Sequence, residues 1–147
     1  MKKIAIFPMI LLCTITCNSK PLAVGVEYKC TTVAMHRFIG NKIEEIKVPS
    51  NAKSFYISER NNSLIAKYKE AGASEVSDNN AILLKTEITE DQGRKFDTSF
   101  FIKKRNDGEN EIQILKEINS QSKIIAMVSI SKYTELPGML RMIHQCI

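Results

Sequence analysis

The chain has 147 residues, a formal net charge of +5, four cysteines, two histidines and no tryptophan. This length corresponds to one domain that is large enough to bury a core. A charge of this size aids solubility and does not by itself predict nucleic-acid binding, and the scattered glycines exclude the Gly-rich phosphate loops of nucleotide-binding proteins.

Residues 1–19 have the pattern of a secretory signal peptide. Lys2 and Lys3 precede an uncharged, mostly apolar run over residues 4–16, which is too short to span a bilayer. The small residues Cys17 and Ser19 predict cleavage after Ser19. We therefore expect a signal peptide over 1–19, a single β-rich domain over 24–147, and export to the periplasm or out of the cell.

Cys17 has an alternative use, because a bacterial lipoprotein carries its lipid on a cysteine near the start. The preceding residues, Thr14-Ile15-Thr16, match that motif only loosely, since it usually has Leu three before the Cys and Gly, Ala or Ser just before it. We expect contact with a membrane only if Cys17 is lipidated.

Two cysteines, Cys30 and Cys146, follow the predicted signal peptide. In an oxidising compartment an even number of cysteines predicts disulfide bonding, and two cysteines allow one intramolecular pairing. The bond would tie the first strand to the end of the last.

Strand signals recur along the rest of the chain. Residues 26–39 are rich in β-branched and aromatic residues and end at a Gly-Asn turn. Further runs of strand character, separated by turn residues, cover 53–59, 63–69, 82–88, 96–103, 111–118, 123–133 and 139–147. Residues 111–118 could also form a short helix, but the Asp107-Gly108 hairpin signal before them favours a strand. The pattern predicts an all-β antiparallel meander of about eight strands in a small closed or partly open barrel.

The alternating runs also indicate which side chains lie inside. We expect the interior to contain Phe96, Phe100, Ile124, Val128 and Met142, which either fill it or line a cavity. In an even-stranded meander the first and last strands are neighbours, so a Cys30–Cys146 bond would close the seam. That pairing sets His144 opposite position 32 and His36 about 13 Å further along, too far for a shared metal. We expect neither a metal nor a cofactor.

Catalytic patterns are scarce in this sequence. A nucleophilic enzyme would have to use His36 or His144 as its base. The run Phe100–Arg105 mixes aromatic and basic residues, and we interpret it as a strand whose basic end meets solvent, with no nucleic-acid partner. We expect a non-enzymatic exported binding protein for a protein partner or a small apolar ligand. The alternatives are a structural or envelope-associated protein or lipoprotein without a discrete ligand and, less favoured, a His-dependent enzyme.

Two families share parts of this outline. The meander is similar to lipocalin-like barrels, which usually carry Gly-x-Trp on the first strand, where this chain has Gly25-Val26-Glu27. Tyr28-Lys29-Cys30 and Cys146 resemble the two ends of periplasmic inhibitors of C-type lysozyme, but their Ser-Gly-x-x-Tyr-type loop has no counterpart here. The sequence therefore assigns no family.

Overall fold

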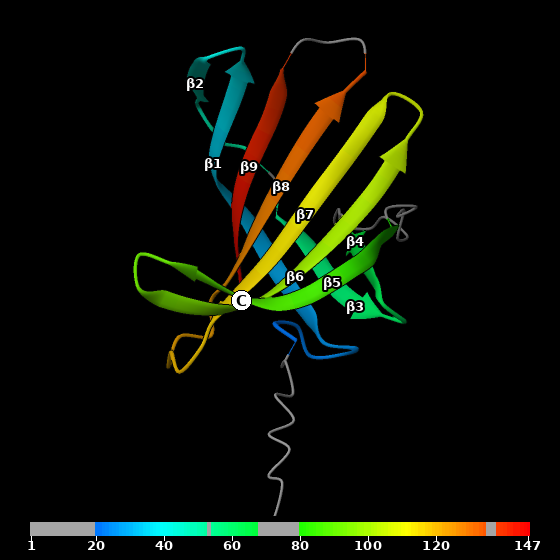
Figure 1. Ribbon diagram of the computed structural model, residues 1–147, viewed down its shortest axis with the longest axis vertical. Coiled ribbons are helices and arrows are strands. Elements are labelled where there is room, and N and C mark those ends of the chain that lie inside the picture. Colours follow the sequence, from blue (N-terminus) through cyan, green and yellow to red (C-terminus); the bar gives the residue numbers. More distant parts are fainter. Residues whose placement is uncertain (1–19, 53, 68–79, 135–137) are drawn as a thin grey trace, which may run out of the picture.

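The computed structural model describes residues 20–52, 54–67, 80–134 and 138–147, and these ranges fold into nine strands of one antiparallel sheet (Figure 1). The strands are β1 (Glu27–Ile39), β2 (Lys42–Ile46), β3 (Phe55–Arg60), β4 (Ser63–Lys67), β5 (Asn80–Asp91), β6 (Arg94–Arg105), β7 (Gly108–Glu117), β8 (Ile125–Tyr133) and β9 (Met139–Cys146). The predicted all-β antiparallel meander is confirmed, including a strand rather than a helix in the β7 region. In the described ranges no helix is long and apolar enough to cross a membrane.

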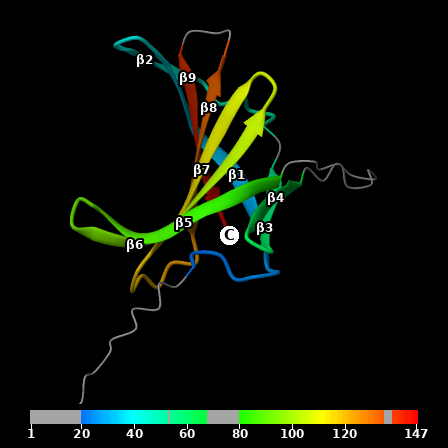
Figure 2. The ribbon, with the colours of Figure 1, turned by 45° about the vertical axis from the view of Figure 1, so that its right-hand side comes forward.

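The sheet is ring-like because its first and last strands pair. Each strand from β3 to β8 pairs with the next, and β1 pairs with β3 through Glu27–Cys30 and with β9 through Cys30–Phe38. The ring is visible in Figure 2, where the sheet curves from β1 round to β8 and β9. Its interior is the space in which a core or a site can form.

Strand β2 was not indicated by the sequence. It forms a hairpin with the far end of β1, where Ile39 pairs with Lys42 across the predicted Gly40-Asn41 turn. Its sequence, KIEEI, is charged and mostly exposed, so no apolar alternation marks it. The strand covers an edge of β1 that β3 does not reach.

Two-residue loops join several neighbouring strands. Asn61 and Asn62 link β3 to β4 with φ angles of 52° and 58°, and Gln92 and Gly93 link β5 to β6 with φ angles of 49° and 76°. Positive φ at both positions is the geometry of a type I′ turn, which matches the twist of the flanking strands. The predicted turns at these two places are confirmed.

Gly108 has a specific structural role at the start of β7. The loop before it is Asn106-Asp107, and Gly108 itself pairs with Arg105. Its φ is 151°, and a Cβ added there would lie 1.9 Å from the backbone oxygen of Lys132 on β8. Only glycine allows this close approach of the two backbones.

The apolar core fills one end of the ring, around the disulfide. Cys30 and Cys146 are directly opposite each other in the β1–β9 register and are bonded, with a sequence separation of 116. This confirms the predicted pairing. Leu22, which precedes the strands, is buried in the same core, with Ile57, Phe101, Ile114 and Ile125. The disulfide and the core together hold the seam closed at this end.

The sequence misassigned the inner face of several strands. On β5, Ile82 and Leu84 are 63% and 61% exposed, whereas Ala81 is buried. On β8 the buried side chains are Ile125, Met127, Ser129 and Ser131, so the expected interior residues Ile124 and Val128 are on the outer face. On β6 the inner residue is Phe101, and Phe96 and Phe100 lie on the other face. Of the five residues expected inside, Met142 lines the interior.

Candidate functional site

A cavity of about 350 Å³ lies inside the ring beside the core. Every strand except β2 contributes at least one side chain to its walls. Phe55 of β3, Leu64 of β4 and Ala81 of β5 form an apolar side, while β6 to β9 supply most of the polar groups. The cavity therefore combines an apolar wall with a polar one.

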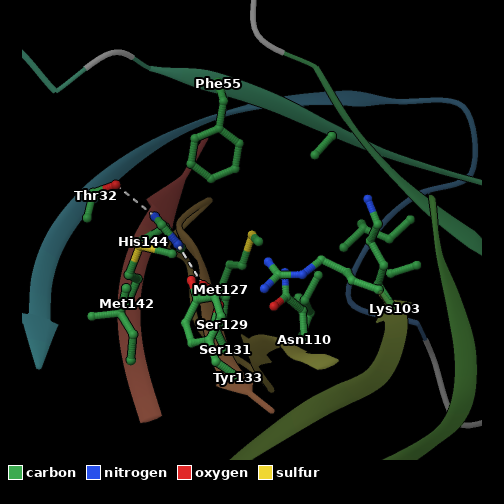
Figure 3. A pocket seen from close by; sticks show the side chains of 16 residues that line it. Thr32, Phe55, Lys103, Asn110, Met127, Ser129, Ser131, Tyr133, Met142 and His144 are labelled. Carbon is green, nitrogen blue, oxygen red and sulfur yellow. Dashed lines mark hydrogen bonds between the residues drawn. The ribbon is translucent and has the colours of Figure 1, made fainter. Parts of the chain in front are cut away.

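The floor of the cavity is built around His144 of β9. Its side chain is buried, with 4% of its surface exposed. Nδ1 lies 3.0 Å from the Thr32 hydroxyl of β1, and Nε2 lies 3.3 Å from the Ser129 hydroxyl of β8 (Figure 3). The Phe55 ring packs edge-on against the imidazole, with ring centroids 4.9 Å apart. These contacts hold the imidazole in one orientation.

Burial lowers the pKa of His144 from 6.5 to about 4. The imidazole is therefore neutral near pH 7, with one ring nitrogen donating and the other accepting a hydrogen bond. The hydroxyls of Thr32 and Ser129 can each take either role, so both ring nitrogens are satisfied. His144 acts as a fixed, neutral polar group.

Ser129 and His144 have the contact expected of a nucleophile and its base, which bears on the less favoured enzyme hypothesis. A base with a pKa of about 4 is a weak proton acceptor at neutral pH. Among the described residues that line the cavity there is no carboxylate to orient the imidazole or to stabilise its charged form. Because Thr32 and Ser129 satisfy both ring nitrogens, the three side chains form a closed hydrogen-bonded group at the floor.

His36, the other candidate base, lies on the opposite face of the sheet. It pairs with Arg141, whose neighbours Leu140 and Met142 both line the cavity. Since side chains alternate along a strand, Arg141 and His36 face outward. Within the described ranges, no cluster of three or more His, Cys, Asp or Glu side chains could hold a metal ion.

Away from the core end of the ring, the cavity wall on β6, β7 and β8 is polar and cationic. One row across the sheet pairs Lys103 of β6 with Asn110 of β7, and Asn110 with Ser131 of β8. The next row pairs Arg105 with Gly108, and Gly108 with Tyr133. The non-glycine side chains of both rows line the cavity, and Lys103 lies across it from His144 (Figure 3). We call the group Lys103, Arg105, Asn110 and Tyr133 the mouth.

The Arg105 guanidinium is held at the mouth by two contacts. Its Nε and Nη2 lie 2.8 and 3.3 Å from the two carboxylate oxygens of Asp107, and it stacks on the Tyr133 ring at 5.0 Å. The two Nη1 hydrogens lie outside the pair with Asp107. These two contacts fix the orientation of the guanidinium plane.

The sequence did not identify the mouth. The basic run Phe100–Arg105 was expected to end in solvent, but Lys103 and Arg105 alternate with Lys104 and line the cavity on the same face as Phe101. The available signal was this two-residue alternation of Phe101, Lys103 and Arg105. The cavity is the basis for assigning a function, since no protein-family model, curated protein or solved structure matches this chain.

Proposed function

We propose that this protein is an exported binding protein that holds one small molecule inside its ring-like sheet. The observation that carries the proposal is the cavity of about 350 Å³. Small-molecule sites are typically about 300–1,000 Å³ in volume. Protein interiors otherwise have few voids larger than a water molecule, so a cavity of this size supports a role beyond folding.

The lining of the cavity favours a ligand with both apolar and polar parts. Phe55, Leu64 and Met127 offer apolar contact area, whereas Ser131 and Asn110 offer hydrogen bonds. The sequence alone left open a protein partner or a small apolar ligand. The polar wall adds a requirement for polar groups on the same molecule, since a purely apolar ligand would desolvate that wall without replacing its hydrogen bonds.

Export is supported by the sequence of residues 1–19 and by the bond between Cys30 and Cys146. Disulfides persist chiefly in oxidising compartments outside the cytosol. The protein would therefore meet its ligand in the periplasm or outside the cell.

Binding of the fluorescent probe phenylnaphthylamine tests the cavity directly. Ala66→Trp adds a large ring to the cavity wall, and we expect it to weaken probe binding at least about tenfold by filling the space. The matched control is Ala126→Trp, because Ala126 lies between the inward-facing Ile125 and Met127 and faces outward. Circular dichroism and a free-thiol count confirm that each variant is folded with its disulfide formed.

Two outcomes would overturn the proposal. One is a wild-type protein that binds neither phenylnaphthylamine nor its anionic analogue, which would favour the protein-partner or structural alternatives. The other is a folded Ala66→Trp variant that binds the probe as tightly as the wild type, since that would place binding outside the cavity.

A further inference from the structure

The charges on the cavity walls have one sign. Among the described residues that line the cavity, the charged side chains are Lys103 and Arg105. His144 also lines it but is neutral near pH 7. They occupy alternate positions of β6, so their Cα atoms lie roughly 7 Å apart at the rise of an extended strand. Arg105 is paired with Asp107, but the Asp107 side chain is 66% exposed and its charge is screened by solvent. The cationic side of this concavity therefore still favours anions.

The same rows contain an acceptor that lacks a partner. The Asn110 oxygen Oδ1 is buried and has no hydrogen-bond partner among the described residues, and Asn110 is directly opposite Lys103 in the register. Buried polar atoms are nearly always hydrogen-bonded. An unpaired acceptor needs a donor, which an ionised acid lacks, so a head group that fits here carries a hydroxyl or amide beside its acidic group. Position and chemistry thus both favour a polar head group at the mouth.

The opposite part of the cavity has the reverse character. Phe55, Leu64 and Met127 are buried and belong to the hydrophobic core as well as to the cavity wall. A molecule that reaches from this wall to the mouth must change from apolar to anionic along its length. The apolar and cationic parts of the wall therefore predict how a ligand is oriented in the cavity as well as which groups it carries.

We infer that the ligand is a small anionic amphiphile, with its apolar part against Phe55 and Met127 and its acidic group at Lys103 and Arg105. This inference rests on the proposed function and adds the chemical class and the orientation of the ligand. A carboxylate, sulfonate or phosphate would fit the Arg105 guanidinium equally well by charge and geometry.

A matched pair of probes separates the charge from the apolar body. Anilinonaphthalene sulfonate and phenylnaphthylamine share one ring skeleton and differ by the sulfonate. We expect the wild type to bind the anionic probe at least about tenfold more tightly, as one charge-assisted contact requires. That preference should shrink as salt is added, because screening weakens the attraction.

Neighbouring lysines of β6 supply the matched variants. Lys103→Met removes a cation that lines the cavity, and Lys104→Met removes an exposed one beside it. We expect Lys103→Met to lose about tenfold in affinity for the anionic probe while its affinity for the neutral probe stays within about twofold. Lys104→Met should change either affinity by less than about twofold. Arg105→Met, a second test at an independent position, should show the same selective loss.

The outcomes distinguish this inference from the proposal on which it rests. Equal affinities of the wild type for the two probes would overturn the anionic class and leave the small-molecule site standing. Equal loss of both probes in folded Lys103→Met and Arg105→Met would also overturn it, because the two side chains would then act through shape. Failure of both probes to bind the wild type would overturn the proposed function itself.

Discussion

Lys20 Nζ lies 2.5 Å from Glu59 Oε1 and 3.0 Å from Asn62 Oδ1, so the start of the described chain is tied to the β3–β4 hairpin. The Glu59 side chain is 1% exposed, and its other oxygen, Oε2, has no hydrogen-bond partner among the described residues. Pro21 and Leu22, which follow Lys20, are buried. One ion pair thus fixes the segment that crosses the end of the ring beside the core.

We expect Lys20→Met to lower the free energy of unfolding by about 1–3 kcal/mol, because it leaves a buried carboxylate without its cation. The Lys20 side chain is 33% exposed, and solvent screening keeps the loss below that for a fully buried pair. Urea unfolding followed by circular dichroism measures the change. Lys29→Met, at an exposed position of β1, is the control. A loss no larger than that of the control would contradict the structural role of the pair.

Breaking the disulfide should destabilise the fold strongly. The Cys30–Cys146 bond closes a loop with a sequence separation of 116 residues. In the chain-entropy model a loop of this length contributes about 5 kcal/mol. We expect the urea midpoint of the wild type to fall on addition of reductant. The double variant Cys30→Ala/Cys146→Ala should start at the lower midpoint and not respond. A reduced wild type, with two free thiols counted, that kept its original midpoint would refute this expectation.

The buried imidazole of His144 should make stability depend on pH. Its pKa is lowered to about 4 in the folded state, and in the unfolded state it returns to 6.5. Between these values the unfolded chain binds more protons, so stability is lost as pH falls from about 6.5 to about 4, by an amount on the order of 3 kcal/mol. Below that window both states are protonated and the contribution stays constant.

Urea midpoints at pH 7, 6, 5 and 4 measure this dependence. The control variant His144→Gln removes the titrating group and keeps a side chain that can hydrogen-bond to Thr32 and Ser129. We expect the variant to lose less stability over the window than the wild type. Parallel curves for the two proteins would show that other groups set the pH dependence.

Gly108 and Gly93 allow a steric clash to be separated from backbone strain. Both have positive φ, but a Cβ at Gly93 meets nothing within 4 Å, whereas one at Gly108 meets the Lys132 backbone oxygen. We expect Gly93→Ala to cost about 1 kcal/mol and Gly108→Ala about 3 kcal/mol or more, because β7 and β8 must move apart. Thermal and urea unfolding give both values, and similar losses at the two sites would argue against the close approach.

The export proposal predicts a processed start of the chain. Mass spectrometry of the protein recovered from outside the cytosol should find a new N-terminus between Cys17 and Ala23, with cleavage after Ser19 expected. A diacylglyceryl mass on Cys17 would instead establish the lipoprotein alternative. Intact Met1 on the exported protein would exclude both forms of processing.

The sequence was sufficient for the meander of β3 to β9 and for the seam between β1 and β9, although it missed β2. The turns at Asn61-Asn62 and Gln92-Gly93 could be predicted because few residue types tolerate positive φ at two successive positions. The pairing of Cys30 with Cys146 followed from counting cysteines and strands. Placing His144 opposite position 32 followed from that pairing, and the structure pairs Thr32 with His144.

The sequence was not sufficient for the inner face or for the site. When the inner face of a strand is assigned from alternating apolar and polar residues, the more apolar face is assumed to point inward. On β8 the inner face ends in Ser129 and Ser131, and on β6 it ends in Lys103 and Arg105, because these strands pass from the core into a polar cavity. The rule therefore fails where a strand serves both core and site.

The two ends of the described chain lie together at the core end of the ring. Ile147 exchanges backbone hydrogen bonds with Lys29 near the start of β1, and Lys20 is bound to the β3–β4 hairpin. Arg105 and Tyr133 are at the far ends of β6 and β8 (Figure 1). A tether joined to the described chain at Lys20 or Ile147, whether a lipid, a fusion partner or an immobilisation tag, would therefore attach at the end of the ring opposite Arg105 and Tyr133. On the proposed function, an anchored copy would keep the Arg105 and Tyr133 end accessible to a ligand from the surrounding fluid.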